Sequence, residues 1–272
     1  MERVLVCVLA KTRAHELCFA SFKRCVLDEL NADLAVALTI DHDYDYANPF
    51  WQHAKYRWTA PDFADYGQGF DLAQRLACAE REIAPADWRA LLAVKGVWQG
   101  RIHSPDPQPS ASSILIFCRW LLLHGLRQDG VLERYDRFIV TRSDFAWLSP
   151  HPPLSVLDPH AIWVPEGENY GGINEASRRD IEDCLSMLDE IVLYPLELRQ
   201  EMQHKTWNDE QFFAHHLSRR GLSDRIRSFP YVMYTARPLR DSSPTWSRGK
   251  YEPAAGHYIK YPGEYRIARA FA

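Results

Sequence analysis

YDRFIVTRSDFAW (residues 135–147) is the stretch that decides the fold of this 272-residue chain. Its β-branched and aromatic residues predict a central strand, which ends in Arg142-Ser143-Asp144. In open α/β sheets, ligands bind in the crevice beyond the carboxyl ends of the strands, so Asp144 is the first candidate for a functional residue. Ser and Asp also turn chains and cap helices, and the spacing fits this plain structural role equally well.

The first forty residues predict a βαβ unit. Residues 3–10 and 32–40 are apolar runs of strand length, and a helical apolar stripe covers residues 14–30 between them. This order implies two parallel strands joined by a right-handed crossover. The turn Lys11-Thr12-Arg13 lacks the glycines of a dinucleotide-binding loop, but basic residues before a helix suit a phosphate. The alternative is that Lys11 and Arg13 are solvated loop charges that bind no ligand.

The rest of the chain continues this α/β pattern. Helices are predicted over residues 69–81, 85–93, 177–192 and 208–219, with a further helix that ends near 128 and is capped by Ser110 or Ser112; strands are predicted over 161–164 and 225–235. We therefore expect one α/β domain over residues 1–240 with a mostly parallel central sheet. Residues 241–272 form an aromatic and basic tail.

Composition narrows the classes of function. A net charge of −4 with 25% charged residues lacks the basic excess of nucleic-acid-binding proteins. No apolar run approaches the roughly 20 residues of a membrane span, and the N-terminus has no signal-peptide pattern, so a cytoplasmic protein is expected. The six cysteines form no C-x-x-C pair and are expected to be buried thiols.

The segment after the second strand, DHDYDYAN (41–48), resembles the start of a calcium loop. Its sixth and twelfth positions are Tyr46 and Gln52, where such a loop needs Gly and Glu. Two interpretations stay open: Asp41 or Asp43 accepts a hydrogen bond from the base or ribose of a ligand, or the segment is a solvated acidic turn. Phosphate-loop and G-x-S-x-G motifs do not occur.

Six segments together resemble a known family. They are CVLAKTRAHEL (7–17), NADLAV (31–36), YDYANPFWQHAKYRW (44–58), YDRFIVTRSDF (135–145), IWVPEGENYGGIN (162–174) and GHYIKY (256–261). Their order and spacing resemble nucleotide-sugar glycosyltransferases of the GT-A fold from bacterial surface-polysaccharide pathways and large algal viruses. The resemblance implies a single α/β/α sandwich that holds a nucleotide diphosphate-sugar, with a divalent metal (Mn²⁺ or Mg²⁺), at the C-terminal edge of the sheet.

The resemblance also implies roles for individual residues. Ala10, Thr12, Arg13, Arg142, Ser143 and Lys260 would contact the donor, Asp41 and Tyr46 would lie near its base, and Asp144 and His257 would bind the metal. The tail would close over the donor, with Lys260 gripping the diphosphate opposite Arg13. The sequence departs from the family at two places: Arg142-Ser143-Asp144 has one carboxylate instead of Asp-x-Asp, and Glu175-Ala176 replaces an expected Asp-Arg.

A catalytic base is predicted at the start of the helix 208–219. Asp209 and Glu210 are adjacent there, and only one is expected to face the cleft because neighbours on a helix lie about 100° apart. Asp209 suits a capping role, so Glu210 is the predicted base, with Glu175 as the next candidate. Trp207 could stack on a sugar ring. Capping and compensation of the helix dipole would explain both carboxylates without catalysis.

The expected function is therefore transfer of a hexosyl or pentosyl group from a nucleotide diphosphate-sugar to a carbohydrate hydroxyl, in the synthesis of a surface polysaccharide. Two alternatives remain at this stage. One is a sugar- or nucleotide-binding regulator that kept the fold and lost the chemistry, which the two departures favour. The other is a nucleotidyltransferase that makes the activated sugar, although the glycine-rich basic loop usual after its first strand is absent.

Overall fold

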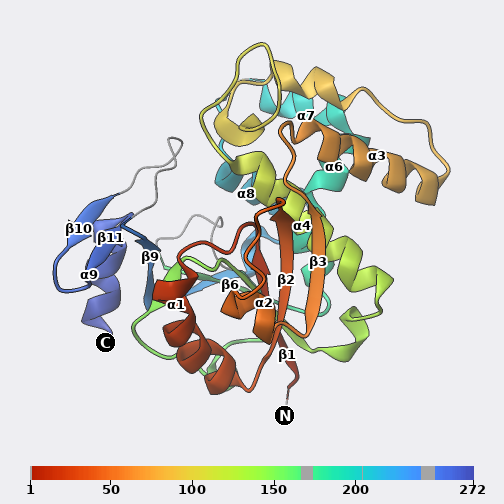
Figure 1. Ribbon diagram of the computed structural model, residues 1–272. Coiled ribbons are helices and arrows are strands. Elements are labelled where there is room, and N and C mark those ends of the chain that lie inside the picture. The colour runs from red at the N-terminus through yellow and green to blue at the C-terminus, as the bar shows by residue number, and fades with distance from the viewer. Residues whose placement is uncertain (1, 167–173, 204, 240–248) are drawn as a thin grey trace.

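The fold is built on a mostly parallel sheet of seven strands (Figure 1). The computed structural model describes residues 2–166, 174–203, 205–239 and 249–272. The strands are β1 (Val4–Leu9), β2 (Asp33–Ile40), β3 (Tyr56–Pro61), β4 (Arg137–Thr141), β6 (Ile162–Pro165), β7 (Asn174–Ser177) and β8 (Ile226–Phe229), in the order β3-β2-β1-β4-β7-β6-β8. Only β7 runs antiparallel to its two neighbours. The α/β class, the parallel β1 and β2, and the central position of β4 confirm the predictions.

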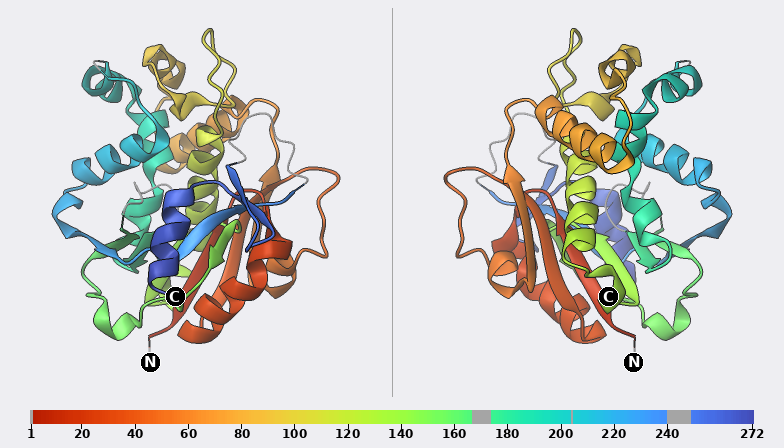
Figure 2. Two further views of the ribbon diagram at one scale, coloured as in Figure 1. Left: turned by 90° about the vertical axis from the view of Figure 1, so that its left-hand side faces the viewer. Right: turned by 90° about the vertical axis from the view of Figure 1, so that its right-hand side faces the viewer.

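Helices cover both faces of this sheet (Figures 1 and 2). One face holds α1 (His15–Phe22), a π-helical continuation (Lys23–Asp28) and α2 (Pro49–His53). The helices that pack on or beyond the other face are α3 (Gly67–Arg81), α4 (Ser112–Gln128), α5 (Ile181–Leu185), α6 (Met187–Leu193), α7 (Pro195–Met202) and α8 (Asp209–Arg219). The side chains of β1 alternate between the two layers and are all buried, which explains why its sequence is apolar throughout.

A second, antiparallel sheet joins the tail to the rest of the chain. Its order is β10 (Lys250–Glu252), β11 (His257–Ile259), β9 (Met233–Arg237) and β5 (Phe145–Trp147). Helix α9 (Pro262–Ala270) follows β11 and packs on β9. The described part of the tail thus pairs directly with β9 and, through β9, joins the same sheet as β5.

The stretch 135–147 crosses from one sheet to the other. The predicted single strand is in fact β4 in the main sheet and β5 in the second, and Arg142-Ser143-Asp144 forms the corner between them. The Ser143 hydroxyl fixes this corner by donating to the carbonyl oxygen of Arg13 at 3.0 Å. Asp144 therefore lies at the carboxyl end of the central strand, as predicted, and also where two sheets meet.

Several local predictions need correction. Helix α4 has no side-chain cap, because the Ser110 hydroxyl donates to the Val97 carbonyl instead. The predicted helix over residues 177–192 consists in fact of the last residue of β7, a turn and two short helices, α5 and α6. The predicted strand over residues 225–235 covers parts of two strands, β8 and β9. The sequence patterns do not predict the helices α2, α7 and α9 or the strands β3, β7, β10 and β11. Short 3₁₀ turns occur at Trp88–Ala93, Val97–Gln99, Leu132–Arg134, Leu154–Val156 and Ser223–Arg225. All six cysteines are buried free thiols, as expected. In the described parts of the chain, no helix is long and apolar enough to cross a membrane.

Candidate active site

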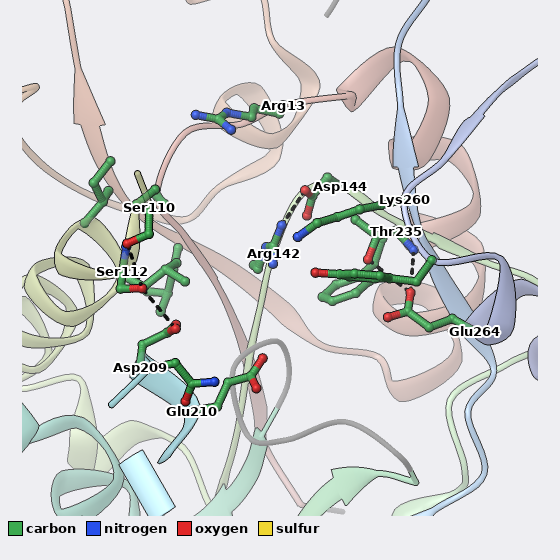
Figure 3. Close-up of a pocket in the computed structure, with 18 of the residues that line it drawn as sticks. Arg13, Ser110, Ser112, Arg142, Asp144, Asp209, Glu210, Thr235, Lys260 and Glu264 are labelled. Atoms are coloured by element: carbon green, nitrogen blue, oxygen red, sulfur yellow. Dashed lines mark hydrogen bonds and ion pairs between the residues drawn. The ribbon is translucent and has the colours of Figure 1, made fainter. Parts of the chain in front are cut away.

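A cavity of about 850 Å³ opens beside the corner between the two sheets (Figure 3). Most of its lining comes from the turn after β1, the start of α4, the corner after β4, the start of α8, β9 and the residues from Lys260 into α9. Its volume lies within the roughly 300–1,000 Å³ typical of small-molecule sites. The site thus gathers segments from the whole length of the chain at the carboxyl end of β1 and β4.

The turn after β1 contributes Lys11 and Arg13 to the cavity wall. Ala10 and Ala14, on either side of it, adopt left-handed backbone conformations with φ of 64° and 51°, which are unusual for residues with a Cβ. Lys11 is neutralised, since its Nζ lies 2.7 Å from Asp62 and 3.1 Å from Asp41. Arg13 is the second basic residue that this turn places at the cavity.

Three residues predicted at the donor lie elsewhere. The side chain of Thr12 is buried, where its hydroxyl accepts from Asn48 Nδ2 at 2.7 Å and bonds the Tyr44 hydroxyl at 3.1 Å. Asp41 binds Lys11, and Tyr46 is half exposed among aromatic rings. None of the three lines the cavity. Ala10 does line it, whereas Ser143 lies behind the wall and holds the turn and the corner together.

Asp144 lies in a cluster of positive charge. Its Oδ2 accepts from Arg142 Nη2 at 2.6 Å and from Arg237 Nη1, and all but 3% of Asp144 is buried. Burial alone would raise the pKa of this carboxyl, but the two guanidinium groups outweigh it and lower the pKa to about 2. Asp144 is therefore ionised at any physiological pH, and one carboxylate serves two arginines.

Lys260 adds a third cation to the same cluster. It lines the cavity, and its pKa is lowered to about 8 by burial and by the charges of Arg142 and Arg237, which Asp144 and Glu264 only partly offset. Three cations thus face two carboxylates. We call Arg142, Arg237 and Lys260 the cationic cluster. Arg142 and Lys260 reach the cavity, while Arg237 lies buried behind Asp144.

The far side of the cavity is acidic. Asp209 and Glu210 at the start of α8 both line it, together with Glu166 after β6. In Figure 3 the two α8 carboxylates lie on the side away from Lys260 and Glu264. The expectation that only one of the pair faces the cavity is therefore wrong, because the first helical turn is open to the cavity along both residues.

The start of α8 also differs from prediction in its capping. Asn208 caps the helix in a capping box with Gln211, whereas Asp209 Oδ1 accepts from the Ser112 hydroxyl at 3.0 Å and ties α8 to α4. Trp207 is 7% exposed and its indole donates to the Met202 carbonyl, so its ring is core packing and not a sugar platform. Glu210 remains the candidate base at the cavity surface.

Glu175, the second candidate base, lies away from the cavity. It is fully buried in β7, where its Oε1 accepts from Arg137 Nε at 2.9 Å and Oε2 lies 3.8 Å from His151. An acceptor cannot reach this carboxylate. The role suggested for Glu175 is therefore corrected to an internal ion pair that joins β7 to β4.

The residues named for a metal do not fit one. His257 is buried and shares a hydrogen bond of 3.0 Å with the Tyr234 hydroxyl, and it does not line the cavity. Asp144 already faces two guanidinium groups, which would repel a divalent cation. Across the described ranges, no group of three His, Cys, Asp or Glu side chains is placed to hold an ion.

Sequence reasoning missed Arg237, Thr235 and Glu264. Arg237 ends β9 directly after an apolar run, which is the kind of position that made Asp144 a candidate, but its partner lies 93 residues away. Glu264 accepts from the Thr235 backbone N–H and hydroxyl at 3.3 and 3.2 Å and so anchors α9 beside Lys260. The stretch GENYGGI (167–173), which belongs to one of the six segments that resemble the glycosyltransferase family, lies outside the described residues.

These observations define an α/β protein with a cavity, lined by both charged and apolar side chains, at the carboxyl edge of a mostly parallel sheet. No protein-family model matches the chain, and no characterised protein is significantly similar to it in sequence. Function must therefore be argued from the cavity itself.

Proposed function

We propose that this protein is a glycosyltransferase that moves a sugar from a nucleoside diphosphate-sugar to a hydroxyl group of a carbohydrate acceptor. The observation that carries the proposal is the division of one cavity into a side with excess positive charge and a side with carboxylates. A diphosphate needs positive charge around it, and an attacking hydroxyl needs a carboxylate that accepts its proton. The resemblance in the sequence points to the same chemistry.

The positive side suits the diphosphate. Arg13, Arg142 and Lys260 reach the cavity from three separate segments, so they can contact a ligand from different directions. Arginine makes paired hydrogen bonds to phosphate oxygens, and lysine supplies a compact charge. When the bond between the sugar and the diphosphate breaks, its electron pair passes to the diphosphate. The cations stabilise the negative charge that develops there.

The acidic side suits the acceptor. Glu210 is the proposed general base: it takes the proton from the acceptor hydroxyl as the oxygen attacks the anomeric carbon of the sugar. Asp209 is held by Ser112 and stays a lesser candidate. A base within hydrogen-bond reach of the attacking group typically contributes 10² to 10⁴-fold in rate.

The function is tested in two steps. Nucleoside diphosphate-sugars with uridine, guanosine, adenosine and cytidine bases are screened by thermal shift, where a ligand at a hundred times its dissociation constant adds about 2.7 kcal/mol of stability. The donor found is then incubated with oligosaccharide acceptors, and the product is detected by mass spectrometry. We expect Glu210→Gln to keep donor affinity and lose at least about 100-fold in transfer rate.

Asp209→Asn is the matched control on the same helical turn, and it should retain most of the activity. If the protein binds a donor but transfers no sugar, it is a binding protein of this fold. If none of the diphosphate-sugars binds, the proposal is wrong.

A further inference from the structure

We infer that Arg142, Arg237 and Lys260 neutralise the diphosphate of the bound donor in place of a divalent metal, with Asp144 holding the two arginines in position. This inference rests on the proposed function and extends it. It assigns to protein side chains the charge compensation that the resemblance gives to Mn²⁺ or Mg²⁺.

The geometry of Asp144 is the first argument. Hard divalent cations bind proteins through oxygen ligands, usually carboxylates that face them without competing positive charge. The Oδ2 of Asp144 is instead shared by Arg142 and Arg237, and Oδ1 is buried without a hydrogen-bond partner among the described residues. A metal at Oδ1 would bring two more positive charges to within a few ångströms of two guanidinium groups. Burial would strengthen that repulsion.

The electrostatics at Lys260 are the second argument. Burial and the charges of Arg142 and Arg237 together outweigh the attraction of Asp144 and Glu264, so the charged form of Lys260 is disfavoured before any ligand binds. A partly buried cation is costly unless negative charge compensates it. A diphosphate would supply negative charge at this place, whereas a metal would add further positive charge.

The connections of the cluster are the third argument. Arg142 comes from the corner after β4, Arg237 ends β9, and Lys260 follows β11, so the three cations belong to strands of both sheets. Asp144 is bonded to two of them, and its backbone carbonyl accepts from the Ala236 N–H at 2.8 Å. Asp144 is therefore placed as a positioning residue: its carboxylate orients Arg142, which lines the cavity, and holds the buried Arg237 behind it.

The test is calorimetric titration of the purified protein with inorganic pyrophosphate. It is run once in excess EDTA and once with saturating Mg²⁺ or Mn²⁺. Pyrophosphate carries the recognised group without requiring the base or sugar to be known. We expect binding in EDTA, with an affinity that added metal does not raise by more than about threefold. Binding that needs the metal would overturn the inference and leave the proposed function standing.

Variants of the cluster locate the binding site. In EDTA, Arg142→Gln and Lys260→Met should each weaken pyrophosphate binding by about 10- to 100-fold, the equivalent of one charged hydrogen bond. Arg266→Gln and Lys250→Met remove exposed charges from α9 and β10 and should leave the affinity unchanged. Equal affinities for all four variants would place the anion elsewhere and overturn the inference. Failure of pyrophosphate and of every diphosphate-sugar to bind, with or without metal, would remove the proposed function as well.

Discussion

Two buried carboxylates of this protein have opposite surroundings. Glu175 is fully buried and pairs with a single arginine, Arg137. The nearby His151 is neutral at pH 7, because burial lowers its pKa to about 4. One negative charge, on Glu175, is therefore balanced by one positive charge, on Arg137, and burial raises the pKa of Glu175. Neither residue of this pair lines the cavity beside Asp144.

Asp144 is buried almost as deeply, but the charges of the described residues around it do not balance. Two guanidinium groups and Lys260 surround it, its pKa is lowered to about 2, and the cluster opens on the cavity. From the sequence, Asp144 is a candidate metal ligand and Glu175 a candidate catalytic base, and neither role fits its surroundings. The difference between them is the charge balance of their neighbours: a balanced buried pair is complete without a ligand, whereas an unbalanced one beside a cavity is suited to bind one.

The largest expected effect comes from breaking the balanced pair. Arg137→Met leaves Glu175 buried without its cation, and loss of one partner of a buried ion pair typically costs about 3 to 5 kcal/mol. We expect a loss of this size in the free energy of unfolding, measured by urea titration. Pyrophosphate affinity of the folded protein should not change. Arg266→Met, at an exposed position, is the control and should cost less than about 0.5 kcal/mol.

A double variant sharpens this prediction. Replacing both Arg137 and Glu175 by Met removes the two charges together, and an apolar pair of similar volume is often as stable as the ion pair. The double variant should recover most of the stability that Arg137→Met loses. If the double variant is less stable than the single variant, the ion pair contributes more to stability than the balance of its two charges explains.

A second prediction concerns the pH dependence of ligand binding by the unbalanced cluster. Lys260, surrounded by Arg142, Arg237, Asp144 and Glu264, has a pKa of about 8 in the ligand-free protein. Below pH 8 it is already charged, whereas above pH 8 it must take up a proton to pair with the ligand. Affinity for pyrophosphate should therefore fall above pH 8, by up to about tenfold per pH unit.

Lys260→Arg is the control for this titration, because arginine stays protonated over the whole range. The ratio of wild-type to Lys260→Arg affinity cancels the ionisation of pyrophosphate itself. That ratio should be constant below pH 7.5 and decline between pH 8 and 9.5. A ratio that stays flat to pH 9.5 would show that the charge of Lys260 does not contribute to binding.

The sequence predicts those parts of the fold whose signals are local. The run β1–α1–β2 and the edge position of Asp144 follow from contiguous apolar patterns. Strand β3 carries a different local signal, the alternation of Tyr56 and Trp58 with Arg57 and Thr59, and in the structure these residues alternate between half-buried and exposed. The capping of α8 was ambiguous because Asn208 and Asp209 are both good caps, and the tertiary contact of Asp209 with Ser112 separates their roles.

Other features depend on contacts that no local pattern reveals. The chain leaves the main sheet at Arg142-Ser143-Asp144 because β9 pairs with β5, and those strands are about 90 residues apart. The same pairing brings Arg237 to Asp144. From the sequence alone, a single carboxylate at the end of a strand could be a metal ligand or an anchor for arginines, and only the partners distinguish the two.

The smallest expected effect is a gain in stability when a charge of the unbalanced cluster is removed. The pKa of Lys260 is about 8 in the folded protein and lies below its ordinary value of 10.5. The folded protein thus disfavours the charged form, and this penalty is fully present below pH 8 and disappears as the pH rises towards 10.5. Lys260→Met removes the penalty at pH 7. We expect it to raise the free energy of unfolding of the ligand-free protein by roughly 1 kcal/mol, a value reduced for the partial exposure of the side chain.

Lys250→Met, on the neighbouring strand β10, is the control and should change stability little. Urea titrations at pH 7 and pH 10 measure the difference: the gain should be clear at pH 7 and small at pH 10. A variant that loses stability at pH 7 would show that Lys260 is already compensated in the ligand-free protein, and the contrast between the two carboxylate clusters would then rest on Asp144 and its two arginines alone.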